Sequence, residues 1–169
     1  MALFGSARDI SMFRYVNREL MGDIITQQVA YYKYILAETK TNMYGEAAGG
    51  KYFDGPVLLN CLIQISDQIY STDGFGVDLS WAADFAFLMD DLKEANVVPE
   101  IGDILMFQEG YFEVDTLVNN QFFVGKDPDY PNEANPLNPG LSKFGWEVST
   151  ICKTHLVPAD RVNIIKSRL

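Results

Sequence analysis

The chain has 169 residues, of which 48% are hydrophobic and 13% aromatic, and a formal net charge of −10. This length suits one domain with a sizeable core, and this composition excludes a disordered polymer. No apolar run approaches the roughly 20 residues that cross a bilayer, and residues 1–8 lack the apolar core of a secretory signal. We therefore expect an intracellular product with no membrane partner.

The charge is distributed unevenly along the sequence. Residues 1–55 hold six basic and six acidic residues, residues 56–136 hold two basic and fifteen acidic ones, and residues 137–169 hold five basic and two acidic ones. The middle block therefore carries a net charge of −13, which disfavours conventional binding to nucleic acid phosphates. Such a charge indicates either ordinary solubility or a directed surface that docks to other subunits or repels DNA.

Residues 1–28 are predicted to form a helical arm. Apolar residues recur at three- and four-residue spacing from residue 9 to residue 28, with charged residues largely between them, as in an amphipathic helix. The apolar positions are Phe13, Val16, Leu20 and Ile24. Asp9 or Ser11 can supply the N-cap. A lone amphipathic helix before a β-rich body must pack on that body or on a neighbouring subunit.

Residues 29–169 are predicted to form a β-barrel-like domain. β-Branched and aromatic residues predict strands at 29–36, 57–65, 79–88 and 146–156. Glycine-rich loops are expected at 44–50 and 73–76, and a short helix at 90–95. The fold class is thus expected to be mainly β (α+β): a small antiparallel β-barrel or sandwich with an N-terminal amphipathic helix and one short internal helix.

Two consecutive hairpins are expected in the middle of this domain. Residues 104–107 and 111–114 flank Gln108-Glu109-Gly110, where the glycine can take a positive φ. The second hairpin is expected to join residues 117–118 to residues 121–124 through Asn119-Asn120, because asparagine tolerates the left-handed conformation. Together they predict a meander, a common unit of small barrels and sandwiches.

Residues 127–143 contain four prolines and are predicted to be a long loop. A loop of this length in a compact domain usually makes contacts or carries function. Asp127, Asp129 and Glu133 are its best metal candidates, because calcium favours clustered carboxylates on a loop. The central glycine and terminal glutamate of an EF-hand are missing, so we assign no metal site.

The two cysteines, Cys61 and Cys152, are predicted to be buried free thiols, since each lies in an apolar, strand-like run. Cys152 and the single histidine, His155, could form a nucleophile pair. Three residues apart on one strand, their side chains should point to opposite faces, which argues against this pairing.

Two other groups of side chains could carry chemistry. Four carboxylates could provide an acid–base pair, although a solvated acidic face is the more common role: Asp84, Asp90, Asp91 and Glu94. Three tyrosines could stack on a sugar or base, although packing between elements is the more common role: Tyr31, Tyr32 and Tyr34. We assign no catalytic residue and no cofactor-binding residue.

Several stretches, from about residue 8 to about residue 162, resemble one known family. They are Tyr32-Lys33 with Thr39 and residues 42–46, then residues 85–92 and 97–104, 108–115, 124–128, 135–140 and 154–160. Together they are similar to the neck (head-completion) proteins of T4-like contractile-tailed bacteriophages.

The resemblance implies a non-enzymatic virion structural protein without substrate or cofactor. Its implied role is a homo-oligomeric ring at the head–tail junction, assembled in the host cytoplasm. The ring would join the DNA-filled head to the tail and help to close the DNA channel after packaging. The implied partners are other copies of the chain, the portal or connector proteins on the head side and the tail-terminator protein, with DNA enclosed but not specifically bound.

Three other hypotheses remain open from the sequence. The chain could form a different ring, such as a tail-completion or baseplate protein. It could be a virion-associated glycan hydrolase that uses Asp90 or Glu94. It could also be a carbohydrate-binding β module that uses the three tyrosines of residues 31–34.

Overall fold

The computed structural model describes residues 7–39, 51–73, 76–121 and 148–159, together with Val162 and Ile164. The helical elements are α1 (Ala7–Glu19), a π-helical turn η1 (Leu20–Ile25) that continues it, and α2 (Met89–Glu94). The strands are β1 (Gln28–Tyr34), β2 (Phe53–Asn60), β3 (Leu62–Ile65), β4 (Ile69–Asp73), β5 (Gly76–Ser80), β6 (Ala82–Leu88), β7 (Ile104–Phe107), β8 (Gly110–Gln121) and β9 (Ser149–Val157).

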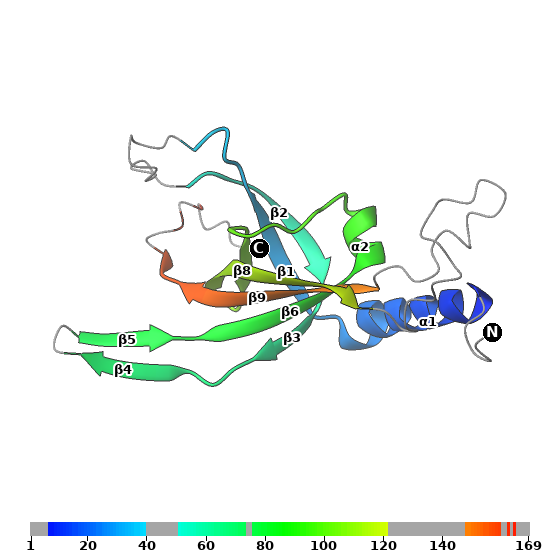
Figure 1. Cartoon of the computed structure of the whole chain (residues 1–169), viewed down its shortest axis with the longest axis horizontal. Coiled ribbons are helices and arrows are strands. Elements are labelled where there is room, and N and C mark those ends of the chain that lie inside the picture. Colours follow the sequence, from blue (N-terminus) through cyan, green and yellow to red (C-terminus); the bar gives the residue numbers. More distant parts are fainter. Residues whose placement is uncertain are drawn as a thin grey trace.

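Seven of these strands form one antiparallel sheet in the order β2-β1-β7-β8-β9-β6-β3 (Figure 1). The predicted fold class, mainly β with an N-terminal helix and a short internal helix, is confirmed. The last strand, β9, lies in the middle of the sheet between β8 and β6, although it is the farthest along the chain. Within the described residues, every helix is too short or too polar to cross a lipid bilayer.

The two edges of the sheet are joined by a single residue. β2 ends at Asn60 on one edge and β3 begins at Leu62 on the other, with only Cys61 between them. The sheet must therefore curl until these edges lie within two residues of each other at that corner. Among the described residues β2 and β3 do not pair, so the sheet is a curled, open one and not a hydrogen-bonded barrel.

A long two-stranded ribbon leaves the sheet at the β3–β6 edge. β3 pairs with β6 from Leu62↔Ala86 to Ile65↔Ala83, and β4 pairs with β5 from Ile69↔Ser80 onward. In Figure 1 the β4–β5 end projects beyond the other strands, and α1 projects from the opposite end of the sheet. The predicted single strand at 79–88 is thus two strands. The predicted loop at 73–76 falls on the turn of a hairpin, of which Gly74 and Phe75 lie outside the described residues.

The first predicted hairpin is confirmed, but its turn uses different residues from those expected. β7 and β8 pair from Ile104↔Glu113 to Phe107↔Gly110. The positive φ values belong to Gln108 (47°) and Glu109 (68°), as in the type I′ turn that matches strand twist. Gly110 is needed for space instead, because a Cβ there would lie 3.1 Å from a Phe112 ring carbon and 3.2 Å from a Leu156 methyl.

The second predicted hairpin is wrong. β8 continues through Asn119 and Asn120, and it pairs with β9 on both sides of them, at Val118↔Ile151 and Gln121↔Ser149. The register shifts between these two pairs, so the asparagines occupy an irregularity in a continuous strand. Pairing with β9 overrides the local preference of two asparagines for a turn.

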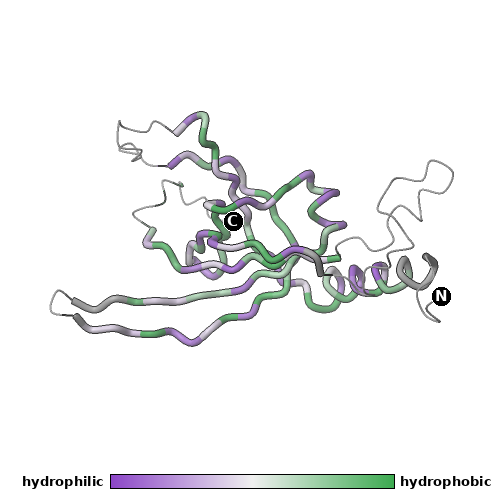
Figure 2. Tube along the Cα trace, viewed as in Figure 1, coloured by the Kyte–Doolittle hydropathy of each residue, from purple (hydrophilic) through white to green (hydrophobic). Residues whose placement is uncertain are grey.

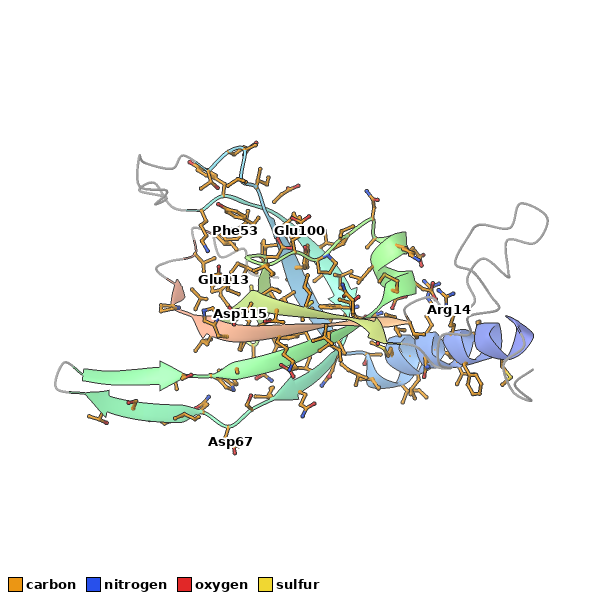
Figure 3. The ribbon with its side chains drawn as sticks, in the orientation of Figure 1. Arg14, Phe53, Asp67, Glu100, Glu113 and Asp115 are labelled. Atoms are coloured by element: carbon orange, nitrogen blue, oxygen red, sulfur yellow. The ribbon has the colours of Figure 1, made fainter. Side chains whose placement is uncertain are left out.

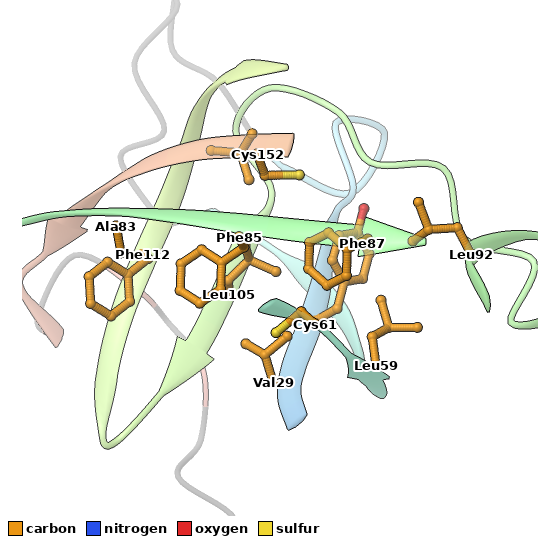
Figure 4. Packing of buried hydrophobic residues seen from close by; sticks show 12 residues of the cluster. Val29, Leu59, Cys61, Ala83, Phe85, Phe87, Leu92, Leu105, Phe112 and Cys152 are labelled. Carbon is orange, nitrogen blue, oxygen red and sulfur yellow. The ribbon is translucent and has the colours of Figure 1, made fainter. Parts of the chain in front are cut away.

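The core lies inside the curled sheet. Alternate residues of β1 and β6 point into it, including Val29, Phe85 and Phe87, and Leu92 of α2 closes one end (Figure 4). Aromatic rings pack edge to face here, with the Phe85 and Phe112 centroids 5.6 Å apart. The other face of β1 packs in a second, smaller cluster formed by Ala30, Tyr32, Ile104, Tyr111, Val157 and Val162. β1 is therefore buried on both faces, which explains its continuous apolar sequence.

The buried free thiols predict a loss of stability at alkaline pH. Cys61 and Cys152 are unpaired and buried, and burial raises the pKa of each to about 12. The same thiols ionise near about 8.5 in an unfolded chain. Stability from the raised pKa is fully present below pH 8.5 and is lost as pH rises toward 12, by up to about 1.4 kcal/mol per pH unit for each thiol.

We therefore expect the urea midpoint to fall steadily between pH 8.5 and pH 11. Replacing both cysteines by alanine should flatten this dependence even though it lowers stability at neutral pH. A wild-type midpoint that stays constant over this range would contradict the prediction.

Candidate functional site

The N-terminal helix is attached to the body through its arginines. Arg14 donates from Nε to Asp90 Oδ2 at 2.8 Å and from Nη2 to the other carboxylate oxygen. One turn later, Arg18 Nε lies 3.0 Å from Asp91 Oδ1, and Arg18 Nη2 pairs with Glu94. Figure 3 shows Arg14 on the side of α1 that faces α2. Two guanidinium groups four residues apart thus match three carboxylates on α2.

This contact brings together three of the four candidate acid–base carboxylates, Asp90, Asp91 and Glu94. They surround the guanidinium groups of Arg14 and Arg18 and are paired with them. Asp91 is the most buried of the three, and burial is the main cause that raises its pKa, opposed by the charge of Arg18. Asp84 lies apart on β6, where it is in register with Lys153 of β9. The geometry of these carboxylates is that of a docking contact between two helices.

The apolar stripe of the arm faces solvent. Phe13, Val16, Leu20 and Ile24 remain 42%, 51%, 41% and 72% exposed, respectively. Figure 2 shows apolar positions recurring along α1 between polar ones. A surface helix normally turns its apolar face to the core and its charged face to water. Here the charged face contacts the body, and among residues 12–25 only Met21, in η1, is buried.

The helix begins earlier than expected. α1 starts at Ala7, so neither Asp9 nor Ser11 is its N-cap. The helix ends in the π-helical turn η1, closed by Thr26 in the left-handed conformation with a hydrogen bond from Thr26 N to Met21 O of 3.0 Å. β1 follows at Gln28, so helix gives way to strand at residues 26–27, close to the expected boundary at residue 28.

Part of the negative charge of the middle block is matched by cations from the first block. Besides Arg14 and Arg18, Lys33 lies 3.0 Å from Glu100 and 3.2 Å from Asp103, and Lys51 lies 2.5 Å from Glu113. Four cations thus face six of the fifteen carboxylates of the middle block, so its negative charge is only partly compensated. Other carboxylates of this block, such as Asp67 at the bend of the ribbon, are exposed (Figure 3).

One carboxylate of this block, Asp103, is fully buried and accepts four hydrogen bonds. Its donors are the Tyr31 hydroxyl, Lys33 Nζ at 3.2 Å, Tyr34 N at 2.9 Å and Glu100 N at 2.7 Å. Gly102, with a φ of +93°, brings the chain into this arrangement. The Gly102-Asp103 pair before β7 therefore fixes the 98–103 loop on β1.

The tyrosines of β1 do not form a stacking surface. Tyr31 and Tyr32 are only 1% and 4% exposed. Burial, followed by the hydrogen bond to Asp103, raises the pKa of Tyr31. Tyr34 packs against Phe53 with ring centroids 5.8 Å apart. Packing between elements is thus the role of these side chains, and the interpretation of Tyr31 and Tyr32 as an exposed stacking surface is wrong.

Cys152 and His155 lie on opposite faces of β9, as the three-residue spacing predicts. Cys152 is in the core, whereas His155 is exposed with its Nδ1 2.8 Å from Asp115 Oδ2. The described residues contain no group of three or more histidine, cysteine or acidic side chains that could hold a metal ion. The loop 127–143, with Asp127, Asp129 and Glu133, lies outside the described residues.

Arg14 is expected to be the main anchor of the arm. Its side chain is only 13% exposed, compared with 51% for Arg18. Arg14→Ala should cost about 1–2 kcal/mol, because it leaves the partly buried Asp90 without its cation. The measurement is hydrogen exchange of the α1 amides, which should become roughly ten times faster. Arg18→Ala is the matched control and should have a smaller effect; equal exchange in both variants and the wild type would contradict this assignment.

Two features of this region were not predicted from the sequence, although signals for both are present. Arg14 and Arg18 stand at i, i+4, as do Asp90 and Glu94, a spacing that suits two helices paired by charge. The β4–β5 hairpin was missed, although β-branched and aromatic residues precede Asp73-Gly74. Asp-Gly between two such runs is a strong hairpin signal.

Comparison of the chain with models of known protein families gives no match, and comparison with curated proteins also gives none.

Proposed function

We propose that this chain is a non-enzymatic structural protein of the neck of a contractile-tailed bacteriophage. It forms a ring of identical subunits at the head–tail junction, joins the DNA-filled head to the tail and helps to close the DNA channel. Its partners are its own copies, the portal or connector proteins and the tail-terminator protein.

The observation that carries this proposal is the orientation of the N-terminal arm. The helix contacts its own body through Arg14 and Arg18 and leaves Val16, Leu20 and Ile24 exposed to solvent. This arrangement suits assembly. Exposed apolar surface of this kind marks interaction sites. An enzyme would call for a cleft with a converging set of reactive groups, whereas the carboxylates of α2 are engaged with the arm.

The segments that resemble the neck family support the proposal from the sequence side. Those within the described ranges form structurally decisive parts of the fold. They include the first four residues of α2, which receives the arm, the Gly102-Asp103 pair, the Gln108-Glu109 turn and the last four residues of the central strand β9. Resemblance in these positions concerns the framework of the subunit and the docking of its arm.

The charge distribution suits a protein that encloses DNA without binding it. Four of the six cations of the first block are paired with carboxylates, which leaves few of them to contact phosphates. Exposed carboxylates such as Asp67 would repel a passing polyanion.

The test is a reconstruction of phage particles by electron cryo-microscopy, combined with particles made without the chain. We expect density for this fold in a ring between head and tail. Without the chain, filled heads and separate tails should accumulate. Complete, infectious particles made in the absence of the chain would refute the proposal, as would its density at the baseplate.

A further inference from the structure

The arm is attached to its own body mainly through charged side chains. Arg14 and Arg18 pair with the three carboxylates of α2, and Met21 is the one buried side chain among residues 12–25. The side chains of Arg18 and Glu94 are 51% and 67% exposed, and ion pairs this exposed contribute little to stability. Lifting the arm from α2 therefore breaks a few ion pairs and exposes a single apolar side chain.

The backbone is strained at the point where the arm joins the body. Thr26 has a φ of 48° and a ψ of 29°, in the left-handed region that β-branched residues rarely adopt. It directly follows η1, and π-helical turns of this kind are frequent at functional sites. The strain is relieved when Thr26 takes an ordinary negative φ. Because all of the arm precedes this residue, that change swings the whole arm away from α2.

Opening of this hinge also gives the arm the reach to contact another copy. A helix rises about 1.5 Å per residue, whereas an extended chain spans about 3.3 Å per residue. The six residues of η1 therefore lengthen from roughly 9 Å to roughly 20 Å when they become extended. Every copy presents the same three carboxylates on α2, so an arm lifted from one copy finds an identical receptor on the next.

We propose that neighbouring copies exchange their arms, so that Arg14 and Arg18 of one copy pair with the α2 carboxylates of the next copy. This inference rests on the proposed ring and identifies the contact that builds it. Exchange remakes the same ion pairs and relieves the strain at Thr26, so its main cost is the freedom lost on association. An arm that always passes to the next copy makes a heterologous contact, which generates a ring when the rotation between copies closes.

Exchange also accounts for the uncovered apolar stripe of the arm. In a single chain the charged face of the arm contacts the body, so Val16, Leu20 and Ile24 are left in solvent. An exchanged arm lies between two bodies, with its charged face on the receiving copy and its stripe toward the copy from which it comes. Both faces of the arm are thus covered only in the assembly, as expected for exposed apolar surface that serves an interaction.

The first test locates the arm by cross-linking in the full-length chain. Tyr15 and Asn60 line one hollow between the arm and the end of β2, so cysteines at these two positions lie close together when an arm is docked. Tyr15→Cys and Asn60→Cys chains are mixed in equal amounts as monomers, concentrated until they assemble, and treated with a short bismaleimide. Each chain carries only one of the two substitutions, so a bridge between positions 15 and 60 must join two chains. The native cysteines are buried.

We expect a cross-linked dimer in this mixture, with the bridge between positions 15 and 60 identified by mass spectrometry. A mixture of Tyr15→Cys and Ile101→Cys chains is the control and should give no bridge, because Ile101 is 67% exposed but lies outside the hollow. A double Tyr15→Cys/Asn60→Cys variant should be linked into a ladder of chains. Assemblies in which this double variant is linked only within single chains would overturn the inference, as would a mixture without the bridge.

A second measurement uses the hinge, with association followed by sedimentation velocity over a range of concentrations. Thr26→Gly removes the strain of the closed arm, so it should weaken association roughly fivefold. Thr26→Val keeps the β-branched side chain and is the matched control, which should assemble like the wild type. Equal association of the Thr26→Gly variant and the wild type would contradict the hinge, and a wild type that stays monomeric at the highest soluble concentration would contradict the exchange.

The proposed function is judged separately, on the particle. A ring in the neck whose arms are linked only within single chains would remove arm exchange and leave the neck role standing. Bridges between chains in a protein that is absent from the neck would remove the neck role and keep arm exchange as the mode of self-assembly.

Discussion

Replacing Asp103 by alanine should destabilise the fold by about 3 kcal/mol or more. The carboxylate is fully buried and accepts from Tyr31, Lys33, Tyr34 and Glu100. Its removal leaves the backbone N–H groups of Tyr34 and Glu100 without this acceptor, leaves the buried Tyr31 hydroxyl only the Val98 carbonyl oxygen at 3.4 Å, and frees the 98–103 loop from β1. Lys33 suffers less, since its side chain is 33% exposed and can be hydrated.

Urea unfolding gives the free energy directly, and for a chain of this size the melting temperature should fall by roughly 6–12 °C. Tyr31→Phe is a suitable comparison, because it removes one of the four donors and should cost about 1 kcal/mol. An Asp103→Ala variant within about 0.5 kcal/mol of the wild type would show that the buried carboxylate contributes nothing net.

Removing the arm should abolish assembly while leaving a folded, soluble body. A truncation that deletes residues 1–26 spares all of β1, which begins at Gln28. The residues that form the sheet and the two core clusters lie outside the arm, and Met21 is the one buried residue among positions 12–25. The truncated chain should therefore keep its β circular dichroism and melt cooperatively, but sediment as a monomer.

In the proposed ring, the arm contributes to assembly through its apolar stripe and to stability through its arginines, and these expected contributions can be separated. An Arg14→Ala/Arg18→Ala double variant keeps the stripe but loosens its attachment to α2, so it should assemble more weakly than the wild type yet better than the truncation. Normal rings formed by the truncated chain, seen by electron microscopy, would contradict the assignment of an assembly role to the arm.

The elements predicted best from the sequence are those fixed by local pattern. The amphipathic arm, β1, the helix at 89–94 and the β7–β8 hairpin each have a periodicity or turn signal within a few residues. Burial of Cys61 and Cys152 also follows from their apolar neighbours. The errors arise where pairing with a strand distant in sequence determines the local structure. Asn119 and Asn120 favour a turn, but hydrogen bonds to β9 keep β8 extended.

The candidate site was less accessible to sequence analysis than the fold. The periodicity of the arm identifies its apolar stripe, but it cannot show which face is covered, because that depends on Asp90, some 76 residues away. The same long-range pairing determines which carboxylates of the acidic middle are compensated. Sequence shows the charge of Glu100, Asp103 and Glu113, while only the fold brings Lys33 and Lys51 to them.

The position of β9 governs how the polypeptide can reach its native state during synthesis. Until Ser149–Val157 has left the ribosome, β8 and β6 lack the strand that joins them. The nascent chain then holds two separate pieces of sheet, β2-β1-β7-β8 and β6-β3, connected through the backbone at Cys61 and along residues 89–103. We therefore expect the fold to be completed late in synthesis, through pairing between strands that lie far apart in the sequence. In the proposed ring, a subunit would therefore become competent for assembly only after β9 has been inserted, and an incompletely folded chain would not be incorporated.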